Sequence, residues 1–337
     1  MTAIKIGCAG IMAVLITGCL EPVTENLWML NKVAQVETEG YCRDVFISGD
    51  SVFVAAGQAG IQLWDISTIS APTQVWEMTL SDLGVSKEIM QVEYEASIKQ
   101  LFALESNERP IHIDLSQSDS IRLHGQLNTS EKTKEFRVIA SAIDTFTVYA
   151  ADNDDGLKWN KFGYDPLTFD GIWNLTGGAE IPCAGLPNGI DIYEDEIVLT
   201  IDQLGIEAFH NQNGQITSSY HIDLDGNARS VTMINGGEFY VACEEGGAYR
   251  LNPGSSSQWA SETQFAEDQY VTHIAENDHQ LVLSCASNGL ALYEASLDLT
   301  IKERGIHDIG YVYHAEFASG YLFAATREGL QIYEIVE

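Results

Sequence analysis

The chain has 337 residues, of which 49 are Asp or Glu and 17 are Lys or Arg, so its formal net charge is −32. Hydrophobic residues make up 45% of the sequence, which is enough for a packed core and excludes a mainly disordered chain. The small number of cations argues against nucleic acid as a partner and against docking on anionic lipid by charge alone, because both depend on Lys and Arg.

The first eighteen residues predict export. Lys5 is followed by an uncharged apolar run over residues 6–15, which is too short to span a bilayer stably. A short basic start before such a run is typical of a cleavable export signal. We therefore expect residues 1–18 to be a signal peptide.

Cys19 lies at the end of this segment, where residues 15–19 read Leu-Ile-Thr-Gly-Cys. The motif resembles the bacterial lipobox, in which a small residue precedes a Cys that is acylated, for example with palmitate. The resemblance implies lipidation of Cys19, followed by a tether over residues 19–29. Leu20 stands where Asp would favour the inner membrane, so the resemblance implies the outer membrane, on its periplasmic or its exposed face. The alternative is a plain secretory signal with an incidental Cys.

A repeat runs through the remaining sequence. A turn residue is followed by an aliphatic residue, any residue, an apolar residue and usually an aromatic one. Seven copies occur at spacings of 40 to 50 residues. They begin at Gly60, Pro110, Gly156, Gly205, Gly247, Gly289 and Gly329. Because a period of this length is typical of propellers and solenoids, the repeat determines the fold prediction.

Each unit contains four short runs rich in β-branched and aromatic residues, and no stretch of helical period. In the first unit we expect strands near 44–47, 52–55, 60–64 and 73–78. The later second strands are expected at 101–104, 147–150, 197–200, 239–242, 281–284 and 321–324. Turns rich in Gly, Asn and Asp, which suit tight hairpins, separate most of the first and second runs.

Four antiparallel strands per repeat predict an all-β, seven-bladed β-propeller over residues 30–337. The seventh unit reaches Glu337 after its third strand, so its fourth strand is expected from residues 32–38. This N-terminal strand would complete the last blade and close the ring, which leaves no unpaired end blade. Six or eight blades, or an open solenoid, are the alternatives.

Residues 52–72 of the first unit include an apolar strand, the Gly60 turn, an Asp-Ile-Ser element and an Ala-Pro pair. This segment resembles one unit of the LVIVD-repeat proteins, and the later units keep a fading form of the pattern. The resemblance implies an exported bacterial or archaeal β-propeller. The family has no agreed catalytic residues, so the resemblance assigns none to this chain.

Four cysteines follow Cys19, namely Cys42, Cys183, Cys243 and Cys285. Disulfides are possible after export, and four cysteines allow three pairings. We expect free, buried thiols instead. Cys243 and Cys285 occupy equivalent positions of neighbouring blades, which the ring geometry should separate by more than the ~7 Å Cα limit for a bridge.

Ligand-binding residues of a propeller are expected where the first strand of each blade begins, at the mouth of the central channel. Alignment of the units places there Asp44, Gln91, Arg137, Gly189, Ser230, His273 and His314. From these we predict a ligand-binding set of Asp44, Gln91, Arg137, His273 and His314. His273, His314 and Asp44 belong to three neighbouring blades and could hold a divalent metal. The alternative is that they bond to backbone and water in a polar channel.

Two Asp-rich turns, over residues 152–156 and 223–227, resemble fragments of calcium loops. Neither carries the Glu that would complete a twelve-residue calcium loop, so solvated turns are the preferred interpretation. Segments 128–134 and 165–183 exceed the repeat and are candidate contact loops.

The sequence contains no G-x-S-x-G, H-E-x-x-H or phosphate-binding Gly-rich motif. We therefore predict a non-catalytic scaffold, lipid-anchored in the outer membrane, which binds a protein or glycan partner. It is expected to be a monomer, to need no cofactor and not to be an enzyme. The alternatives are a hydrolase or lyase, or a metal- or small-ligand-binding protein, with its site at the channel mouth. A component of outer-membrane assembly is a further alternative.

Overall fold

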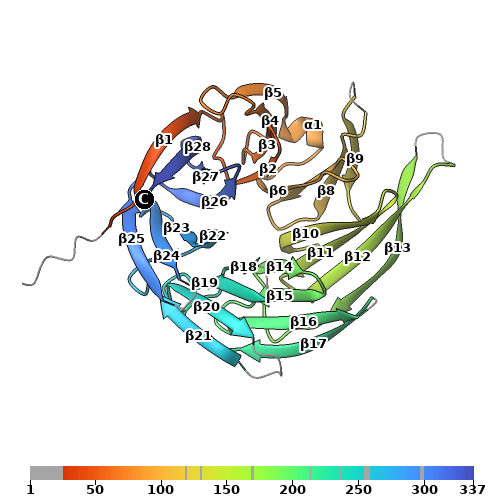
Figure 1. Ribbon diagram of the computed structural model, residues 1–337. Helices are drawn as coiled ribbons and strands as arrows, with labels where there is room; N and C mark the ends of the chain where they lie inside the picture. The colour runs from red at the N-terminus through yellow and green to blue at the C-terminus, as the bar shows by residue number, and fades with distance from the viewer. Residues whose placement is uncertain are drawn as a thin grey trace, which may run out of the picture.

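The structure is a computed structural model that describes residues 26–117, 120–129, 131–167, 171–212, 214–234, 237–253, 259–296 and 300–337. Seven antiparallel, four-stranded sheets form a ring of blades around a central channel (Figure 1). The predicted seven-bladed propeller is thereby confirmed. The signal segment and Cys19 lie outside the described residues, so their prediction is not tested by the structure.

The strands of each blade follow one another from the channel to the rim. Blade 1 contains β2 (Asp44–Ser48), β3 (Ser51–Ala55), β4 (Ile61–Asp65) and β5 (Thr73–Met78). Blade 2 contains β6 (Ile89–Glu95), β7 (Gln100–Glu105), β8 (Pro110–Asp114) and β9 (Arg122–Gln126). Blade 3 contains β10 (Thr133–Ala142), β11 (Thr145–Asp152), β12 (Gly156–Asp165) and β13 (Ile172–Ile181).

The remaining blades repeat this order. Blade 4 contains β14 (Gly189–Tyr193), β15 (Glu196–Thr200), β16 (Ile206–Gln212) and β17 (Gln215–Ile222). Blade 5 contains β18 (Ser230–Ile234), β19 (Glu238–Ala242), β20 (Ala248–Pro253) and β21 (Trp259–Phe265). Blade 6 contains β22 (His273–Asn277), β23 (Gln280–Ser284), β24 (Leu290–Ala295) and β25 (Ile301–His307). Blade 7 contains β26 (Val312–Ala318), β27 (Tyr321–Thr326), β28 (Gly329–Val336) and β1 (Met29–Val36).

The N-terminal strand closes the ring as predicted. β1 pairs antiparallel with β28, from Met29 opposite Val336 to Val36 opposite Leu330. The strand begins three residues earlier than the expected segment 32–38, because its start is fixed by Trp28, which is only 2% exposed. The two ends of the described chain therefore share one sheet.

A steric restriction explains why a glycine stands at the start of the third strand. Gly60 has a φ of 99°, and a Cβ there would lie 2.0 Å from the carbonyl oxygen of Met78 in the fourth strand. Gly329 has a φ of 106°, and its Cβ would lie equally close to the carbonyl oxygen of Val36. Blade 7 thus repeats the contact of blade 1, although its fourth strand comes from the other end of the chain.

The hydrophobic core lies between the blades. The second strands are buried on both faces, as in β7, where all six residues are buried. One cluster, for example, joins Phe323 and Leu330 of blade 7 to Val45 and Val54 of blade 1. Seven such clusters occur among the described residues, so each blade is held mainly by its neighbours.

The structure differs from the sequence prediction in two segments. A four-residue helix, α1 (Leu80–Leu83), follows β5, where no helix was expected; Thr79 and Asp82 form a capping box that starts it. The candidate contact loop 165–183 consists mostly of strand, because β13 occupies residues 172–181. No helix in the described part of the chain is long and apolar enough to cross a membrane.

The four cysteines after Cys19 are free thiols, as expected, but only Cys42, Cys243 and Cys285 are buried, whereas Cys183 is partly exposed. Burial raises the pKa of Cys243 and of Cys285 to about 12. Both thiols therefore stay protonated at neutral pH and are chemically inert core residues.

Candidate functional site

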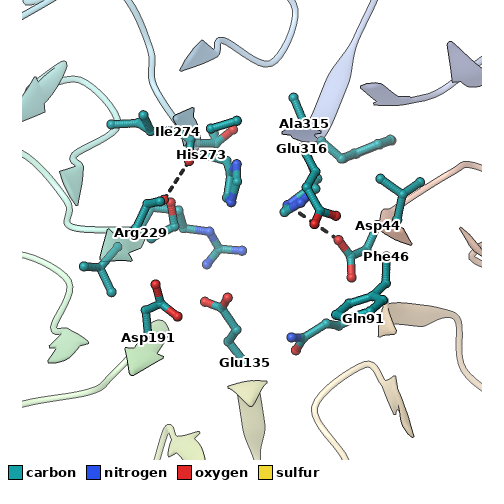
Figure 2. Close-up of a pocket in the computed structure, with 18 of the residues that line it drawn as sticks. Asp44, Phe46, Gln91, Glu135, Asp191, Arg229, His273, Ile274, Ala315 and Glu316 are labelled. Atoms are coloured by element: carbon teal, nitrogen blue, oxygen red, sulfur yellow. Dashed lines mark hydrogen bonds and ion pairs between the residues drawn. The ribbon is translucent and has the colours of Figure 1, made fainter. Parts of the chain in front are cut away.

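A polar cavity of about 500 Å³ occupies the central channel (Figure 2). The inner strands of all seven blades, from β2 to β26, contribute to its wall. The wall contains all five residues of the predicted ligand-binding set, namely Asp44, Gln91, Arg137, His273 and His314. The repeat alignment therefore located the cavity wall, whereas ligand binding there remains a prediction.

Side chains link the inner strands of blades 1 to 4 to the blade that follows each of them. An inner strand pairs with its own sheet on one side only, so N–H groups on its other edge need further acceptors. Carboxylates and one amide of the preceding blade accept these bonds, which we call the blade staples. The staples are Asp44 with the N–H of Val92 (2.9 Å), Gln91 with Phe136 (3.1 Å), Glu93 with Val138 (2.5 Å), Glu135 with Ile190 (3.2 Å) and Asp191 with Met233 (2.8 Å).

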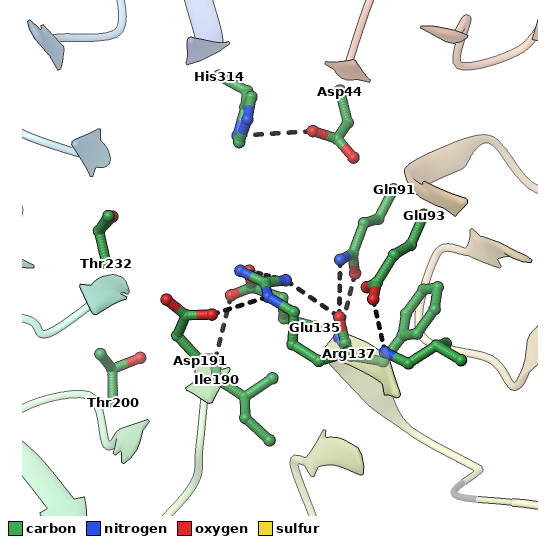
Figure 3. A network of polar contacts seen from close by, with 12 residues as sticks. Asp44, Gln91, Glu93, Glu135, Arg137, Ile190, Asp191, Thr200, Thr232 and His314 are labelled. Carbon is green, nitrogen blue, oxygen red and sulfur yellow. Dashed lines mark hydrogen bonds and ion pairs between the residues drawn. The ribbon is translucent and has the colours of Figure 1, made fainter. Parts of the chain in front are cut away.

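Arg137 lies at the centre of this network (Figure 3). Its Nε donates to Asp191 at 3.1 Å, and its Nη1 lies 2.9 Å from Glu135 and donates to the Phe136 carbonyl at 3.0 Å. Burial alone would lower the pKa of Arg137, but the charges of Glu135 and Asp191 outweigh it and raise the pKa. The guanidinium is thus a permanent cation that neutralises the carboxylates of blades 3 and 4.

The predicted His–His–Asp constellation forms where blades 6, 7 and 1 meet. The rings of His273 and His314 lie 3.9 Å apart, and His314 Nδ1 lies 3.5 Å from Asp44 Oδ1. Nδ1 of His273 is buried without a hydrogen-bond partner in the described structure. No three His, Cys, Asp or Glu side chains among the described residues are arranged to hold a metal ion, either here or at the Asp-rich turns. The metal hypothesis therefore remains a prediction for binding experiments.

Sequence reasoning missed several residues of the wall, namely Arg43, Glu93, Lys134, Glu135, Asp191, Arg229 and Glu316. A usable signal existed for three of them. Glu93, Asp191 and Glu316 each lie two residues beyond an aligned position, and period-2 alternation places such residues on the same face of a strand. Arg137 itself does not occupy the position equivalent to Asp44. Phe136 does, because it pairs with Ala150 of the second strand as Asp44 pairs with Ala55.

Burial controls the protonation of the acidic and histidine side chains that line the channel. It raises the pKa of Asp44 to about 7 and the pKa of Glu93 and of Glu316 to about 8. Burial also lowers the pKa of His314 to about 4 and that of His273 well below its usual range. Near neutral pH, the imidazoles are therefore neutral and Glu93 and Glu316 are largely protonated.

Stability should fall as the pH rises from about 6.5 to about 8. The raised pKa values of Glu93 and Glu316 mean that the folded chain holds protons that the unfolded chain has lost. Each such group removes about 1.4 kcal/mol from the free energy of unfolding per pH unit in this window. The histidines oppose this trend only at the lower end of the window, because in the unfolded chain they are about half protonated at pH 6.5 and mostly neutral above about pH 7. Urea unfolding at several pH values measures the slope.

The control is the double variant Glu93→Gln and Glu316→Gln, which cannot gain charge. It should show a much flatter profile between pH 6.5 and 8 than the wild-type protein. Equal slopes for the two proteins would show that these carboxyls do not cause the pH dependence.

A group of tyrosines and arginines lies beside the channel, where blades 7 and 1 meet. We call Tyr41, Arg43, Tyr311, Tyr313 and Arg327 the Tyr-Arg platform. The guanidinium carbon of Arg43 lies 4.3 Å from the Tyr313 ring, and that of Arg327 lies 4.1 Å from the Tyr311 ring, which are cation–π distances. Tyr41 is 50% exposed.

The two arginines of the platform differ in their charge partners. Arg43 forms an ion pair with Glu88 at 2.6 Å. Arg327 donates to the Tyr313 hydroxyl at 3.2 Å, and no ion pair with a carboxylate is found for it within the described ranges. In a chain of net charge −32, Arg327 is thus an exposed cation framed by aromatic rings.

Comparisons with known proteins support the fold. No family model and no curated protein matches the chain. Among solved structures, the RRP9 WD40 repeats align with a TM-score of 0.68 at 10% identity, over 91% of this chain and 100% of that chain. Sqt1 of Saccharomyces cerevisiae aligns with a TM-score of 0.60 at 14% identity, over 91% of this chain and 99% of that one. The computationally designed Ika8 protein aligns with a TM-score of 0.62 at 11% identity, over 90% and 99%.

At these identities the likeness extends to the fold alone. The protein is a seven-bladed β-propeller with WD40-like structural neighbours. The resemblance of residues 52–72 to the LVIVD repeat gains no support from the family comparison and remains a prediction.

Proposed function

We propose that the protein is a non-catalytic binding scaffold of the cell envelope, lipid-anchored in the outer membrane through Cys19 and related to the LVIVD-repeat proteins. The observation that carries the non-catalytic part is the set of blade staples. Glu135, Asp191 and Arg137 are bonded to one another or to neighbouring backbone, so their polar atoms hold the ring together. This occupation supports a structural role for these groups.

The Tyr-Arg platform is the surface through which we propose that the scaffold binds its protein or glycan partner. Tyrosine rings offer rigid, amphipathic contact area, and Tyr and Arg are enriched where binding energy is concentrated. Arg327 would pair with a carboxylate of the partner, and Tyr41 would contact an adjacent apolar or sugar face. The platform adjoins the cavity through Arg43 and Tyr313, which also line its wall.

One observation favours the alternative of a hydrolase or lyase. His273 Nδ1 has no partner, and Glu316, whose pKa is about 8, lines the same cavity. A neutral imidazole and a protonated carboxyl are the usual pair for general base and general acid catalysis. This alternative requires His273 and His314, whereas the scaffold requires the platform.

The two functions predict opposite outcomes for two pairs of substitutions. Capture of partners from native envelopes should survive His273→Ala with His314→Ala, and should fall at least about tenfold with Tyr41→Ala and Arg327→Ala, the loss expected for interfacial Tyr and Arg. Quantitative mass spectrometry of the captured material measures both. Thermal melts control for folding. Loss of capture only in the histidine variant would contradict the scaffold and favour the channel site.

A further inference from the structure

The N-terminal chain joins the disc at its outer rim, between blades 6 and 7. Trp28 is buried there, and its N–H donates to the Arg304 carbonyl of β25 at 2.8 Å. His307 Nε2 lies 3.1 Å from the Trp28 carbonyl oxygen. The start of β1 meets β25 at this rim (Figure 1), so Trp28 fixes the point at which the preceding chain leaves the disc.

Exposed apolar side chains surround this point. Leu27 and Met29 flank Trp28 in the sequence, and Val336 pairs with Met29 across the sheet. Ile306 follows Gly305, whose Cβ position lies 3.3 Å from the Trp28 carbonyl oxygen. The exposed fractions are 56% for Leu27, 59% for Met29, 48% for Val336 and 45% for Ile306. We call these four residues the rim patch; grouped exposed apolar residues of this kind mark an interaction site.

The position of Cys19 identifies what covers the rim patch. Leu27 lies eight positions after Cys19, and a fully extended chain spans at most 3.3–3.6 Å per residue, or about 29 Å in total. A lipid on Cys19 therefore keeps the rim patch within that distance of the bilayer. Every other part of the described disc has a longer path to the anchor.

Exposed lysines occur on the strands that carry the rim patch, namely Lys32 on β1 and Lys302 on β25. Arg304 of β25 is paired with Glu294. Long basic side chains beside an apolar surface are suited to the bilayer interface, because their alkyl stems lie on apolar groups while the charges reach the headgroups.

We propose that the rim patch docks on the lipid surface, so that the disc stands on the rim of blades 6 and 7. This inference rests on the lipid anchor of the proposed function. It adds an orientation: the channel axis lies along the membrane plane, and the Tyr-Arg platform opens sideways into the surrounding compartment.

Hydroxyl-radical footprinting of the full lipidated protein tests the docking, because it reads the oxidation of individual side chains. The protein is placed in vesicles of phosphatidylethanolamine and phosphatidylglycerol and compared with the Cys19→Ser protein in solution. Oxidation of Met29, Leu27 and Ile306 should fall at least about threefold on the vesicles, as expected for side chains at the lipid boundary. Ile143, which is 84% exposed at the turn of blade 3, is the internal control and should not change.

Substitution separates the docking from the anchor. Leu27→Glu with Met29→Glu should restore the oxidation of Ile306 while the protein still floats with the vesicles, and Ile143→Glu should have no effect. Both changes are at exposed positions, and thermal melts verify folding. Flotation without protection of the rim patch would overturn the docking and leave the anchor intact. Failure of the wild-type protein to float would overturn the anchor. Protection in solution, with a doubled mass by light scattering, would overturn the docking in favour of self-association.

Discussion

Replacing Arg137 with Met should lower the free energy of unfolding by about 3–5 kcal/mol, the cost of removing one partner of a buried ion pair. Glu135 and Asp191 would keep their bonds to the N–H groups of Ile190 and Met233 but would lose the cation between them. Methionine fills similar space without charge, so the change isolates the electrostatic loss. Chemical denaturation at pH 7 measures it.

The matched control for Arg137 is Lys87→Met. Lys87 forms an ion pair with Glu108 at 2.6 Å, but both side chains are exposed, so its removal should leave stability close to that of the wild-type protein. The loss in the Arg137 variant should also shrink at low pH, because burial raises the pKa of Glu135 and the orphaned carboxyl can then be protonated. If both Met variants are equally stable, Arg137 is not the centre of the network.

Trp28→Ala should also cost about 3–5 kcal/mol, the usual loss for a large buried aromatic side chain. Trp28 packs in the cluster that joins blades 6 and 7, against Leu292 and Tyr333 among others. Because it lies at the start of β1, the substitution weakens the strand that closes the ring. Urea unfolding measures the loss.

The neighbouring residue Leu27 provides the comparison for Trp28. Leu27 is 56% exposed, so Leu27→Ala should change stability by no more than about 0.5 kcal/mol. Deletion of residues 26–36, which removes Trp28 and β1 together, should be more damaging than either substitution. A deletion variant that melts at the wild-type temperature would show that the ring holds without β1.

The architecture could be predicted from the sequence because steric and burial requirements of the backbone determine the repeated residues. A glycine such as Gly60 or Gly329 begins the third strand where a Cβ would strike the fourth. The second strands are continuous apolar runs because both of their faces are buried. β1 could be assigned to blade 7 because the seventh unit lacked a fourth strand before Glu337.

The site could be predicted only in part, because side-chain partners depend on register. The alignment placed Arg137 in the wall but not its partners: period-2 alternation points to Asp191, whereas Glu135 looks in the sequence like an ordinary solvent-facing carboxylate. The register shift between Ala140 and Ala142 displaces β10 by one residue against β11, so that Phe136 instead of Arg137 faces Ala150, and nothing in the sequence marks this shift. Helix α1 was missed because four residues are too few to show a helical period.

The blade staples have a consequence for how the seven units can diverge. In each staple the donor is a backbone N–H group, such as that of Val92 or Met233, which every amino acid except proline provides. One unit can therefore exchange nearly any residue at the donor position without a compensating change in its neighbour. Staples of this kind allow the sequences of the repeats to diverge while the ring of blades keeps its geometry.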